Sequence, residues 1–520
     1  MSANSSPSVA DTNDDSTIPS SQGDDSGFAS RVRNAVAWRY GGQVAAQIIT
    51  WSSTILVVRL LDPSDYGLFA MSQVLITALA FMNGQSFAAS LVRAAKVGER
   101  EVAQVFGLLL TLNVALATAV FFLAPYSAAY FGEPQVAELL RIQMVLFLIV
   151  PFMALPEAML ARKLQFRPQA LASMSGAVSG ATVALTLAYL GYGVWALVYA
   201  PIVQFAVRAL VVSFAAKVIT VPNFNPRGAR AIITFGGTLT LCQLFWIIQS
   251  QSDIIIAGRQ FEPYELGLYS EALFVALIVT GRFLPPINEV SFPAYSELHN
   301  KGMALAPYFA RVQQTVALVV APIYIGLSLT AHEAVSTLFG PKWIEMAPLL
   351  ANLAMVMPVF AVQIVCAPST NAMGKAWIYL TTSICGAVAF ASCFAFGVSY
   401  GSEGLTYAWW IAAPTLLIIT MALTLPALRL TIFDLFKAWL PAIVSTALMG
   451  MAVYFVLKAM PEWAPWWKLA AIIPVGALVY ASALWVIWPQ VVRDSWEMLR
   501  QKKKPEAPAQ PVNDLPTAQI

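Results

Sequence analysis

The chain alternates long apolar runs with short polar joints, and this alternation limits the folds that it can adopt. Each run is about twenty residues long, which matches the roughly 30 Å of hydrocarbon in a bilayer. Hydrophobic residues make up 58% of the 520 residues and charged residues only 11%, whereas soluble domains carry about 25% charged residues. A soluble fold could not remove so much apolar surface from water. The pattern therefore predicts an all-α integral membrane protein.

The sequence contains about fourteen such runs, and each is expected to be one transmembrane helix. They cover roughly residues 36–58, 67–89, 104–124, 138–158, 169–190, 195–216, 231–257, 267–287, 312–331, 348–368, 378–398, 405–427, 438–457 and 469–488. Residues 1–30 contain five Asp and no Lys or Arg, which predicts a disordered acidic tail. Residues 489–520 are expected to form a second tail, first basic and then disordered.

Basic residues are distributed unequally between the two sides of this arrangement. With the N-terminus inside, 22 of the 30 Lys and Arg residues fall on the inner side and 6 on the outer side. Positive residues accumulate on the cytoplasmic side of membrane proteins. Both termini are therefore predicted to be cytoplasmic, which requires an even number of helices.

Two charged joints match without gaps at a distance of 200 residues. Arg, an acidic residue, Pro, a second acidic residue, Gly, Leu and an aromatic residue recur at the same offsets in residues 59–69 and 259–269. Further along, Tyr-Phe-Gly at 130–132 recurs as Leu-Phe-Gly at 338–340. Pro63 and its counterpart are expected to end one helix, while the Gly lets the next helix pack closely.

The matches divide the chain into an internal repeat. We expect a six-helix lobe at 31–217, a second six-helix lobe at 218–428, and two appended helices at 429–488. Since six is an even number, both lobes have the same orientation and are parallel repeats about an axis along the membrane normal. That arrangement places a central cavity between two lobes and is typical of transporters.

The eighth apolar run carries an intramembrane charge stripe. Glu271, Arg282 and Glu289 are 11 and 18 residues apart, so at helical spacing all three lie within about 20° of one line. An unpaired charge at mid-membrane costs about 2.5–3.5 kcal/mol on insertion scales. The stripe is therefore expected either to line a water-filled cavity or to form an interhelical ion pair that locks the bundle.

Other polar residues within the runs are further candidates. Gln243 and Asp253 belong to a polar series in the seventh run, which could line the cavity or form hydrogen bonds between helices. Arg39 and Arg208 lie within snorkelling distance of the cytoplasmic surface. Each could bind an anionic substrate or serve only as a topology anchor.

The sequence argues against several kinds of chemistry. Its four cysteines lie inside apolar runs without CxxC spacing, which indicates buried thiols. Only two His are present, so no metal site is expected. No Gly-rich phosphate loop followed by Lys occurs, and we expect no cofactor, no nucleic-acid partner and no enzymatic activity.

The motifs resemble those of a known family. The joint Val58-Arg-Leu-Leu-Asp-Pro-Ser-Asp-Tyr-Gly-Leu68 and the segment Ser252-Asp-Ile-Ile-Ile-Ala-Gly258 are similar to those of the bacterial polysaccharide transporters. So are Leu266-Gly-Leu-Tyr-Ser-Glu-Ala272 and Val290-Ser-Phe-Pro-Ala-Tyr-Ser296. These transporters are the Wzx-type flippases of the MATE/MurJ-like MOP superfamily.

The resemblance implies a location, a substrate and a mechanism. The substrate is an undecaprenyl-diphosphate-linked oligosaccharide, turned from the cytoplasmic to the periplasmic leaflet of the bacterial inner membrane by alternating access coupled to an ion gradient. Arg282 is the first diphosphate candidate, because guanidinium groups bind phosphate bidentately, followed by Arg39 and Arg208. Glu271 and Asp253 are the ion-coupling candidates, and membrane lipids and the polysaccharide polymerase or export machinery are the implied partners.

Two relatives within the superfamily remain open as alternatives. A multidrug/cation antiporter would need an acidic cavity without a diphosphate-binding Arg. A lipid II flippase of the MurJ type would differ in that its loss is lethal. A polysaccharide polymerase or ligase is disfavoured, because those enzymes resemble proteins with one long periplasmic loop and all outer joints here are short.

Overall fold

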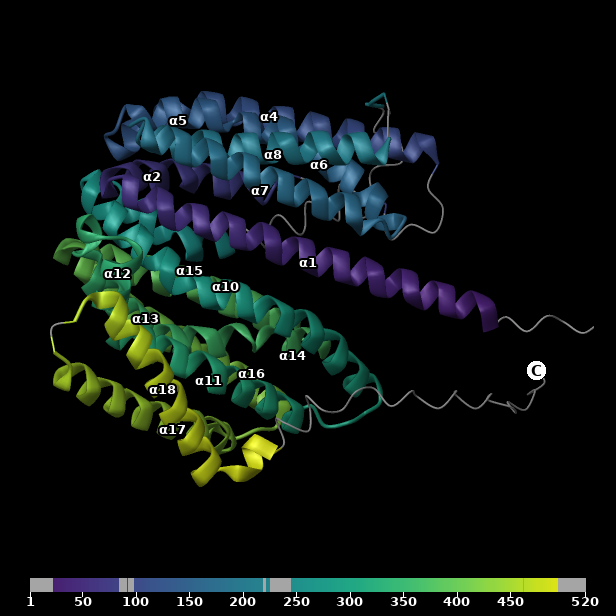
Figure 1. The fold of residues 1–520 in the computed structure, drawn as a ribbon. Coiled ribbons are helices and arrows are strands. Elements are labelled where there is room, and N and C mark those ends of the chain that lie inside the picture. The colour runs from purple at the N-terminus through teal and green to yellow at the C-terminus, as the bar shows by residue number, and fades with distance from the viewer. Residues whose placement is uncertain are drawn as a thin grey trace, which may run out of the picture.

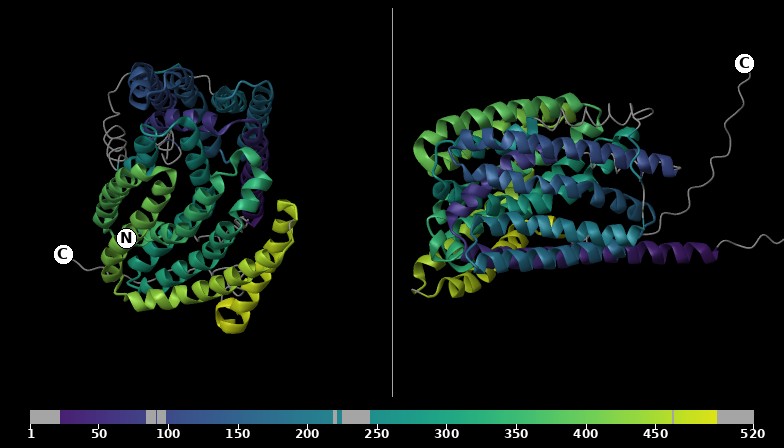
Figure 2. Two further views of the ribbon diagram at one scale, coloured as in Figure 1. Left: turned by 90° about the vertical axis from the view of Figure 1, so that its left-hand side faces the viewer. Right: turned by 90° about the horizontal axis from the view of Figure 1, so that it is seen from above.

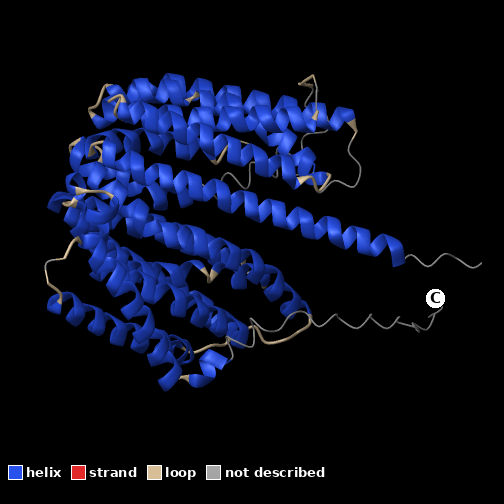
Figure 3. Ribbon diagram, in the orientation of Figure 1, coloured by secondary structure: helices blue, strands red, loops and turns tan. Residues whose placement is uncertain are grey.

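The protein is helical throughout the residues that its computed structural model describes (Figure 3). These residues are 22–83, 91, 98–217, 221–224, 245–461 and 463–493, with side chains described at 38 and from 41 onward. The first group of helices is α1 (Gln22–Leu60), α2 (Pro63–Ala80), α4 (Glu99–Phe131), α5 (Gln135–Gln143), α6 (Val145–Arg162), α7 (Phe166–Tyr189) and α8 (Val194–Ala216).

A second group of helices follows the segment 245–257, which is itself helical. Its α-helices are α10 (Pro263–Asn300), α11 (Ala306–Leu329), α12 (Ala331–Leu338), α13 (Met346–Ile364), α14 (Ala367–Ala372), α15 (Ala376–Gly397), α16 (Gly401–Leu428), α17 (Ile432–Ala459) and α18 (Pro465–Ile487). Two short 3-10 helices, η1 (Pro341–Trp343) and η2 (Val398–Tyr400), complete it.

The two groups form separate bundles that meet at one end (Figure 1). In the N-terminal bundle, α1 packs on α7, α7 on α8, α8 on α6 and α6 on α4. In the C-terminal bundle, α13 packs on α10, α11 and α16, while α17 packs on α11 and α18. The main contact between the bundles joins α2 to α10. From that contact the bundles diverge, with α1 and α10 on their facing sides (Figures 1 and 2).

The helices identify the chain as a multi-pass integral membrane protein. Eleven helical segments of the described residues are long and apolar enough to cross a bilayer, and the longest, Ala376–Leu428, contains both α15 and α16. The fold therefore has about eleven to fourteen membrane helices, in agreement with the all-α prediction. The domain boundaries proposed from the repeat stay predictions.

Several helices extend beyond the apolar runs from which they were predicted. α10 continues to Asn300, and α4 spans Glu99–Phe131. In both cases the residues next to the apolar run belong to the same helix. α1 begins at Gln22, within the stretch 1–30 for which a disordered tail was predicted.

The largest hydrophobic cluster lies where the bundles meet. It combines Val57, Val58 and Leu61 from the end of α1 with Leu266 of α10 and Trp343 of η1, all of them buried. Burial of apolar side chains from both bundles in one cluster stabilises their contact. The contact is therefore a packed interface, and it forms the floor of the site described next.

Candidate functional site

The two repeated joints meet each other at the contact between the bundles. We call residues 59–67 and 259–267, together with 337–343, the junction. An added Cβ at Gly67 would lie 1.8 Å from the carbonyl oxygen of Pro263, and one at Gly267 would lie 1.8 Å from that of Pro63. Only glycine fits at either position, because a Cβ there would overlap backbone atoms. The close approach is reciprocal, so each joint packs against its own counterpart.

The repeated arginines also reach across the junction. Arg59 Nε donates a hydrogen bond to the carbonyl oxygen of Leu338 at 2.8 Å, and its Nη2 contacts that of Thr337. In the opposite direction, the Arg259 guanidinium lies over the Tyr130 ring, 5.4 Å from its centroid. Leu338 and Tyr130 begin the second repeated motif. Each arginine therefore contacts the repeated motif of the other bundle.

The second acidic residue of each joint acts within its own bundle. The Asp65 carboxylate accepts a hydrogen bond from the backbone N–H of Val194 at 2.8 Å, at the start of α8. The Glu265 carboxylate accepts one from the backbone N–H of Ser402 at 2.7 Å, at the start of α16. A carboxylate at a helix N-terminus satisfies a free N–H and interacts favourably with the helix dipole. These contacts anchor each joint to the bundle from which it comes.

Further contacts reinforce one side of the junction. Lys342 Nζ lies 2.7 Å from Asp62 Oδ1. Trp343 Nε1 donates a hydrogen bond to the Val58 carbonyl oxygen at 2.9 Å, and its ring packs edge-to-face on Tyr66 at 5.2 Å between centroids. The junction joins packing, hydrogen bonds and an ion pair, and so closes one end of the space between the bundles.

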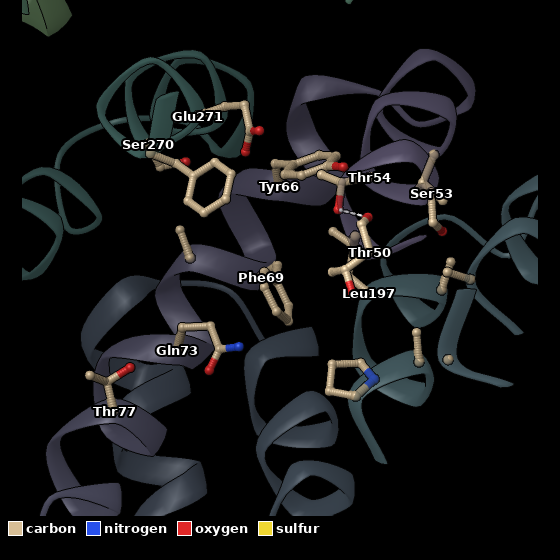
Figure 4. Close-up of a pocket in the computed structure, with 18 of the residues that line it drawn as sticks. Thr50, Ser53, Thr54, Tyr66, Phe69, Gln73, Thr77, Leu197, Ser270 and Glu271 are labelled. Atoms are coloured by element: carbon tan, nitrogen blue, oxygen red, sulfur yellow. Dashed lines mark hydrogen bonds between the residues drawn. The ribbon is translucent and has the colours of Figure 1, made fainter. Parts of the chain in front are cut away.

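A cavity of about 460 Å³ lies behind the junction, between the bundles. α1, α2, α7 and α8 line one wall, while residues 250–254 and α10 line the other. In Figure 4, Ser270 and Glu271 of α10 face Tyr66, Phe69 and Gln73 of α2 across this inter-bundle cavity. The predicted central cavity between two groups of helices is thus present.

Glu271 and Asp253 both line the inter-bundle cavity, but their surroundings differ. Asp253 is 2% exposed and accepts a hydrogen bond from the Tyr269 hydroxyl at 3.1 Å, which in turn accepts one from Trp409 Nε1 at 3.0 Å. Glu271 is 6% exposed, and its carboxylate makes no hydrogen bond or ion pair with the part of the chain that the structure describes. A buried, unpaired carboxylate is unusual, which makes Glu271 the more conspicuous of the two.

The other members of the charge stripe lie elsewhere. Arg282 and Glu289 are exposed, and neither is among the described residues that line the cavities. They share a helix face with Glu271, but Arg282 is eleven residues further along α10, roughly 16 Å at 1.5 Å per residue. Over that distance the bundles diverge (Figure 1), so the same face passes from a bundle contact to an open surface.

Arg208 lines a second cavity, inside the N-terminal bundle. Its Nε lies 2.7 Å from Glu157 Oε1, and the two side chains are 33% and 24% exposed. This cavity, of about 630 Å³, lies between α1, α6, α7 and α8, and Gln43, Gln47 and Gln204 also line it. We call it the glutamine chamber. The side chain of Arg39 and all of Gln243 lie outside the described residues.

Glu157 and the glutamines of the chamber were not predicted as site residues from the sequence. A signal for them exists: Gln43, Gln47, Thr50 and Thr54 follow helical spacing along α1, and so form one polar face within an apolar run. The partnership of Glu157 with Arg208 spans 51 residues, and no local pattern reports it. No group of three or more His, Cys, Asp or Glu residues suited to a metal ion occurs in the described ranges.

Comparison with known proteins identifies the family of the chain. A family model described as "Polysaccharide biosynthesis protein" matches residues 56–348. The succinoglycan biosynthesis transport protein ExoT of Rhizobium meliloti (strain 1021) is 24% identical over 489 residues, which cover 92% of this chain and 98% of that protein.

Solved structures share the fold at low sequence identity. The lipid II flippase MurJ in an inward closed conformation gives a TM-score of 0.72 at 14% identity, covering 87% of this chain and 99% of that one. An inward-facing multidrug resistance MATE transporter of the MOP superfamily gives 0.58 at 17% identity, covering 74% and 94%. The similar proteins are transporters and not enzymes, as the sequence motifs predicted. The chain belongs to the polysaccharide biosynthesis protein family, and it folds like the membrane transporters of the MOP superfamily.

Proposed function

We propose that the protein is a flippase for undecaprenyl-diphosphate-linked oligosaccharide repeat units. It turns these units from the cytoplasmic to the periplasmic leaflet of the bacterial inner membrane, for exopolysaccharide or lipopolysaccharide biosynthesis. Family membership supports the substrate class, and the name of ExoT points to transport in the synthesis of a polysaccharide.

The observation that carries the proposal is the cavity between two bundles that are closed at one end by reciprocal contacts. Alternating access requires a closure that can be exchanged between two ends of one cavity. A junction made of two joints of the same sequence pattern suits such an exchange, because separating the bundles breaks matched contacts together. In this proposal the two bundles are parallel six-helix repeats, within a total of fourteen helices.

The substrate needs cations for its diphosphate and a path for its lipid. We assign the diphosphate first to Arg282, which is exposed on α10, and next to Arg39. Gln243 and Arg208 complete the set of substrate-binding candidates. Guanidinium groups suit this role because they form bidentate hydrogen bonds with phosphate oxygens.

Coupling to an ion gradient is assigned to Glu271 and Asp253, which line the inter-bundle cavity. A carboxylate that has no partner in the closed state is free to bind a proton or a metal cation when the cavity changes its exposure. Glu271 meets this description more closely than Asp253, whose carboxylate already accepts the Tyr269 hydrogen bond. Membrane lipids and the polymerase or export machinery are the proposed partners, and nucleic acid is not.

Topology provides a first test of the proposal. We place both termini in the cytoplasm, so the joint at 458–468 lies outside. A reporter active only in the periplasm should be silent when fused at residue 510 and active when inserted in that joint. The opposite result would reverse the direction of transport proposed here.

Complementation tests the function itself. In cells that lack the gene, lipid-linked oligosaccharide should accumulate in the inner leaflet and surface polysaccharide should be lost, and the wild-type gene should restore export. Normal export in the deletion strain, with drug sensitivity as its only defect, would instead identify a multidrug antiporter.

A further inference from the structure

Four glutamines line the glutamine chamber, and one of them, Gln169, donates a hydrogen bond to the Glu157 carbonyl oxygen at 2.7 Å. Gln43, Gln47 and Gln204 make no hydrogen bond in the described part of the chain. Gln43 is exposed and Gln47 and Gln204 are half-buried, so their side-chain amides remain accessible to a partner that is not part of this chain. Three such amides facing one cavity within a membrane bundle therefore suit a ligand that both donates and accepts hydrogen bonds.

Close helix packing fixes the positions of these groups. An added Cβ at Gly176 of α7 would lie 2.8 Å from the Gln204 carbonyl oxygen, and one at Gly180 would lie 2.9 Å from Gln204 Cβ. Small residues let membrane helices approach closely. α7 and α8 are therefore held together at the level of Gln204, whose amide lies in the chamber wall.

The charge of the chamber argues against an anionic ligand. Its two charged lining residues among those described are Glu157 and Arg208, which form an ion pair at 2.7 Å. The Arg208 charge is thereby balanced, and the Glu157 carboxylate would repel a phosphate. Carboxylate, guanidinium and amide groups in one cavity instead match vicinal hydroxyl groups, because the first accepts hydrogen bonds, the second donates them and amides do both. Phe166 and Phe205 add ring surfaces to the same wall.

We infer that the glutamine chamber binds the glycan of the transported molecule, and not its diphosphate. This inference rests on the proposed flippase function and assigns the sugar to one bundle. The volume of about 630 Å³ lies within the about 300–1,000 Å³ of small-molecule sites and admits a short oligosaccharide.

The position of the chamber agrees with a molecule in two parts. Thr50 and Gln204 line both the chamber and the inter-bundle cavity, so the two spaces adjoin. A glycan in the chamber can therefore continue, through its reducing end, into the cavity between the bundles. The diphosphate and the lipid then lie where the bundles diverge, outside the neutral chamber.

Thiol protection in the purified full-length protein tests the inference. Gln47→Cys is prepared in a background whose four native cysteines are replaced by alanine, with Glu138→Cys on α5 as an exposed control. The probes are repeat-unit oligosaccharides, released by mild acid from the lipid-linked pool of the same cells, and inorganic diphosphate. We expect the oligosaccharide to slow maleimide labelling at position 47 at least about tenfold and to leave position 138 unchanged. Diphosphate should protect neither.

A second measurement does not depend on the cysteine variants. Isothermal titration of the wild-type protein should detect the released oligosaccharide, and Gln204→Leu should weaken its binding about tenfold, the loss of one well-placed hydrogen bond. Protection at position 47 by diphosphate would make the chamber an anion site and overturn the inference. An oligosaccharide that neither protects position 47 nor binds in the titration would overturn it as well.

Complementation separates this inference from the proposed function. If the wild-type gene restores export but the oligosaccharide does not bind the chamber, the glycan assignment fails and the flippase stands. If the wild-type gene does not restore export, the flippase proposal fails whatever the labelling shows. Released oligosaccharide that binds without lipid shows that the glycan alone is recognised, whereas binding only of the lipid-linked form would place recognition outside the chamber.

Discussion

The two bundles are alike where they meet and unlike inside. At the junction, two features of one joint have their counterparts in the other: Gly67 and Gly267 approach Pro residues, and Asp65 and Glu265 cap helices. Inside the bundles the correspondence of chemistry ends. The difference lies in which side chains face their cavities.

The ion pair of the glutamine chamber is replaced by apolar residues in the other bundle. Tyr130 and Leu338 correspond at an offset of 208 residues, and so do the capped positions Val194 and Ser402. The same offset carries Glu157 to Val365 and Arg208 to Leu416. Both apolar residues are 1% exposed and belong to the main hydrophobic cluster.

The C-terminal bundle has a cavity of its own, of about 460 Å³. Trp409 packs edge-to-face on Phe390 and Phe360 there, with ring centroids 5.0 and 5.5 Å away. No charged residue of the described chain lines this cavity. The two bundles therefore share the contacts of the junction but differ in the charge of their cavities. If the glutamine chamber binds the glycan, as we infer, a duplicated architecture has kept its shared interface while one half alone binds that part of the substrate.

The likeness of the two joints predicts equal and large effects at their glycines. Gly67→Ala and Gly267→Ala should each lower export at least about tenfold, because overpacking costs about 1–3 kcal/mol and here displaces backbone. Export is measured in the complemented deletion strain, together with disulfide formation between cysteines at 62 and 342. Gly326→Ala is the matched control, since its Cβ would meet only Met449 Cε at 4.0 Å. A strong effect at one glycine alone would break the symmetry.

The difference between the bundles predicts a separation of stability from function at the ion pair. Arg208→Leu should destabilise the protein by about 2 kcal/mol, between the values of exposed and buried pairs, because it leaves Glu157 uncompensated. Glu157→Val combined with Arg208→Leu reproduces the C-terminal pattern and should restore membrane abundance but not export. Thermal stability of the detergent-solubilised protein and polysaccharide output report the two properties. Restored export would show that the pair is only structural.

The two carboxylates of the inter-bundle cavity should respond differently to neutralisation. Glu271→Gln should lower export to about a tenth or less with normal abundance, since the carboxylate has no partner to lose in the described part of the chain. Asp253→Asn should also lower abundance, because it alters the hydrogen bond from Tyr269. Quantitative immunoblots of membranes beside export rates test this. Equal abundance losses in both variants would remove Glu271 from the list of coupling residues.

The smallest effect is expected in the C-terminal cavity. Thr420→Val removes the hydrogen bond that Gln363 Nε2 donates to Thr420 Oγ1 at 3.2 Å, at a cost of about 1 kcal/mol in stability. Export should stay within about twofold of wild type, whereas Gln204→Leu in the glutamine chamber should lower it several-fold. Similar losses of export in both variants would mean that both bundles contact the cargo.

The sequence predicted the repeated joints, but not their partners. The motif at residues 59–69 and its copy 200 residues later were visible without a structure, and their Gly residues were expected to allow close packing. That Gly67 packs on Pro263 and not within its own bundle depends on tertiary contacts over a long sequence separation. Neither turn chemistry nor helical periodicity contains that information.

Helical periodicity likewise predicted which face of the helix a residue occupies, but not whether that residue is buried or exposed. It placed Glu271 and Arg282 on one face of α10, yet only Glu271 is buried against the other bundle. Where a face becomes exposed depends on where the neighbouring bundle diverges, which a helical wheel cannot represent. Arg208 shows the converse: its position within an apolar run was evident, but its partner Glu157 comes from a different helix.

The junction has more contacts on one side than on the other, and this implies an order in which the contacts break. Beside Arg59, the ion pair of Lys342 with Asp62 and the Trp343 hydrogen bond add to the shared contacts. The residue that corresponds to Lys342 at the 208-residue offset is Pro134, which has no charge. We expect the Arg259–Tyr130 side to part first while the Lys342 side serves as a hinge. A lipid-linked substrate would then leave the protein on one side only, beside α4. An enzyme that receives this substrate would have to bind on the same side.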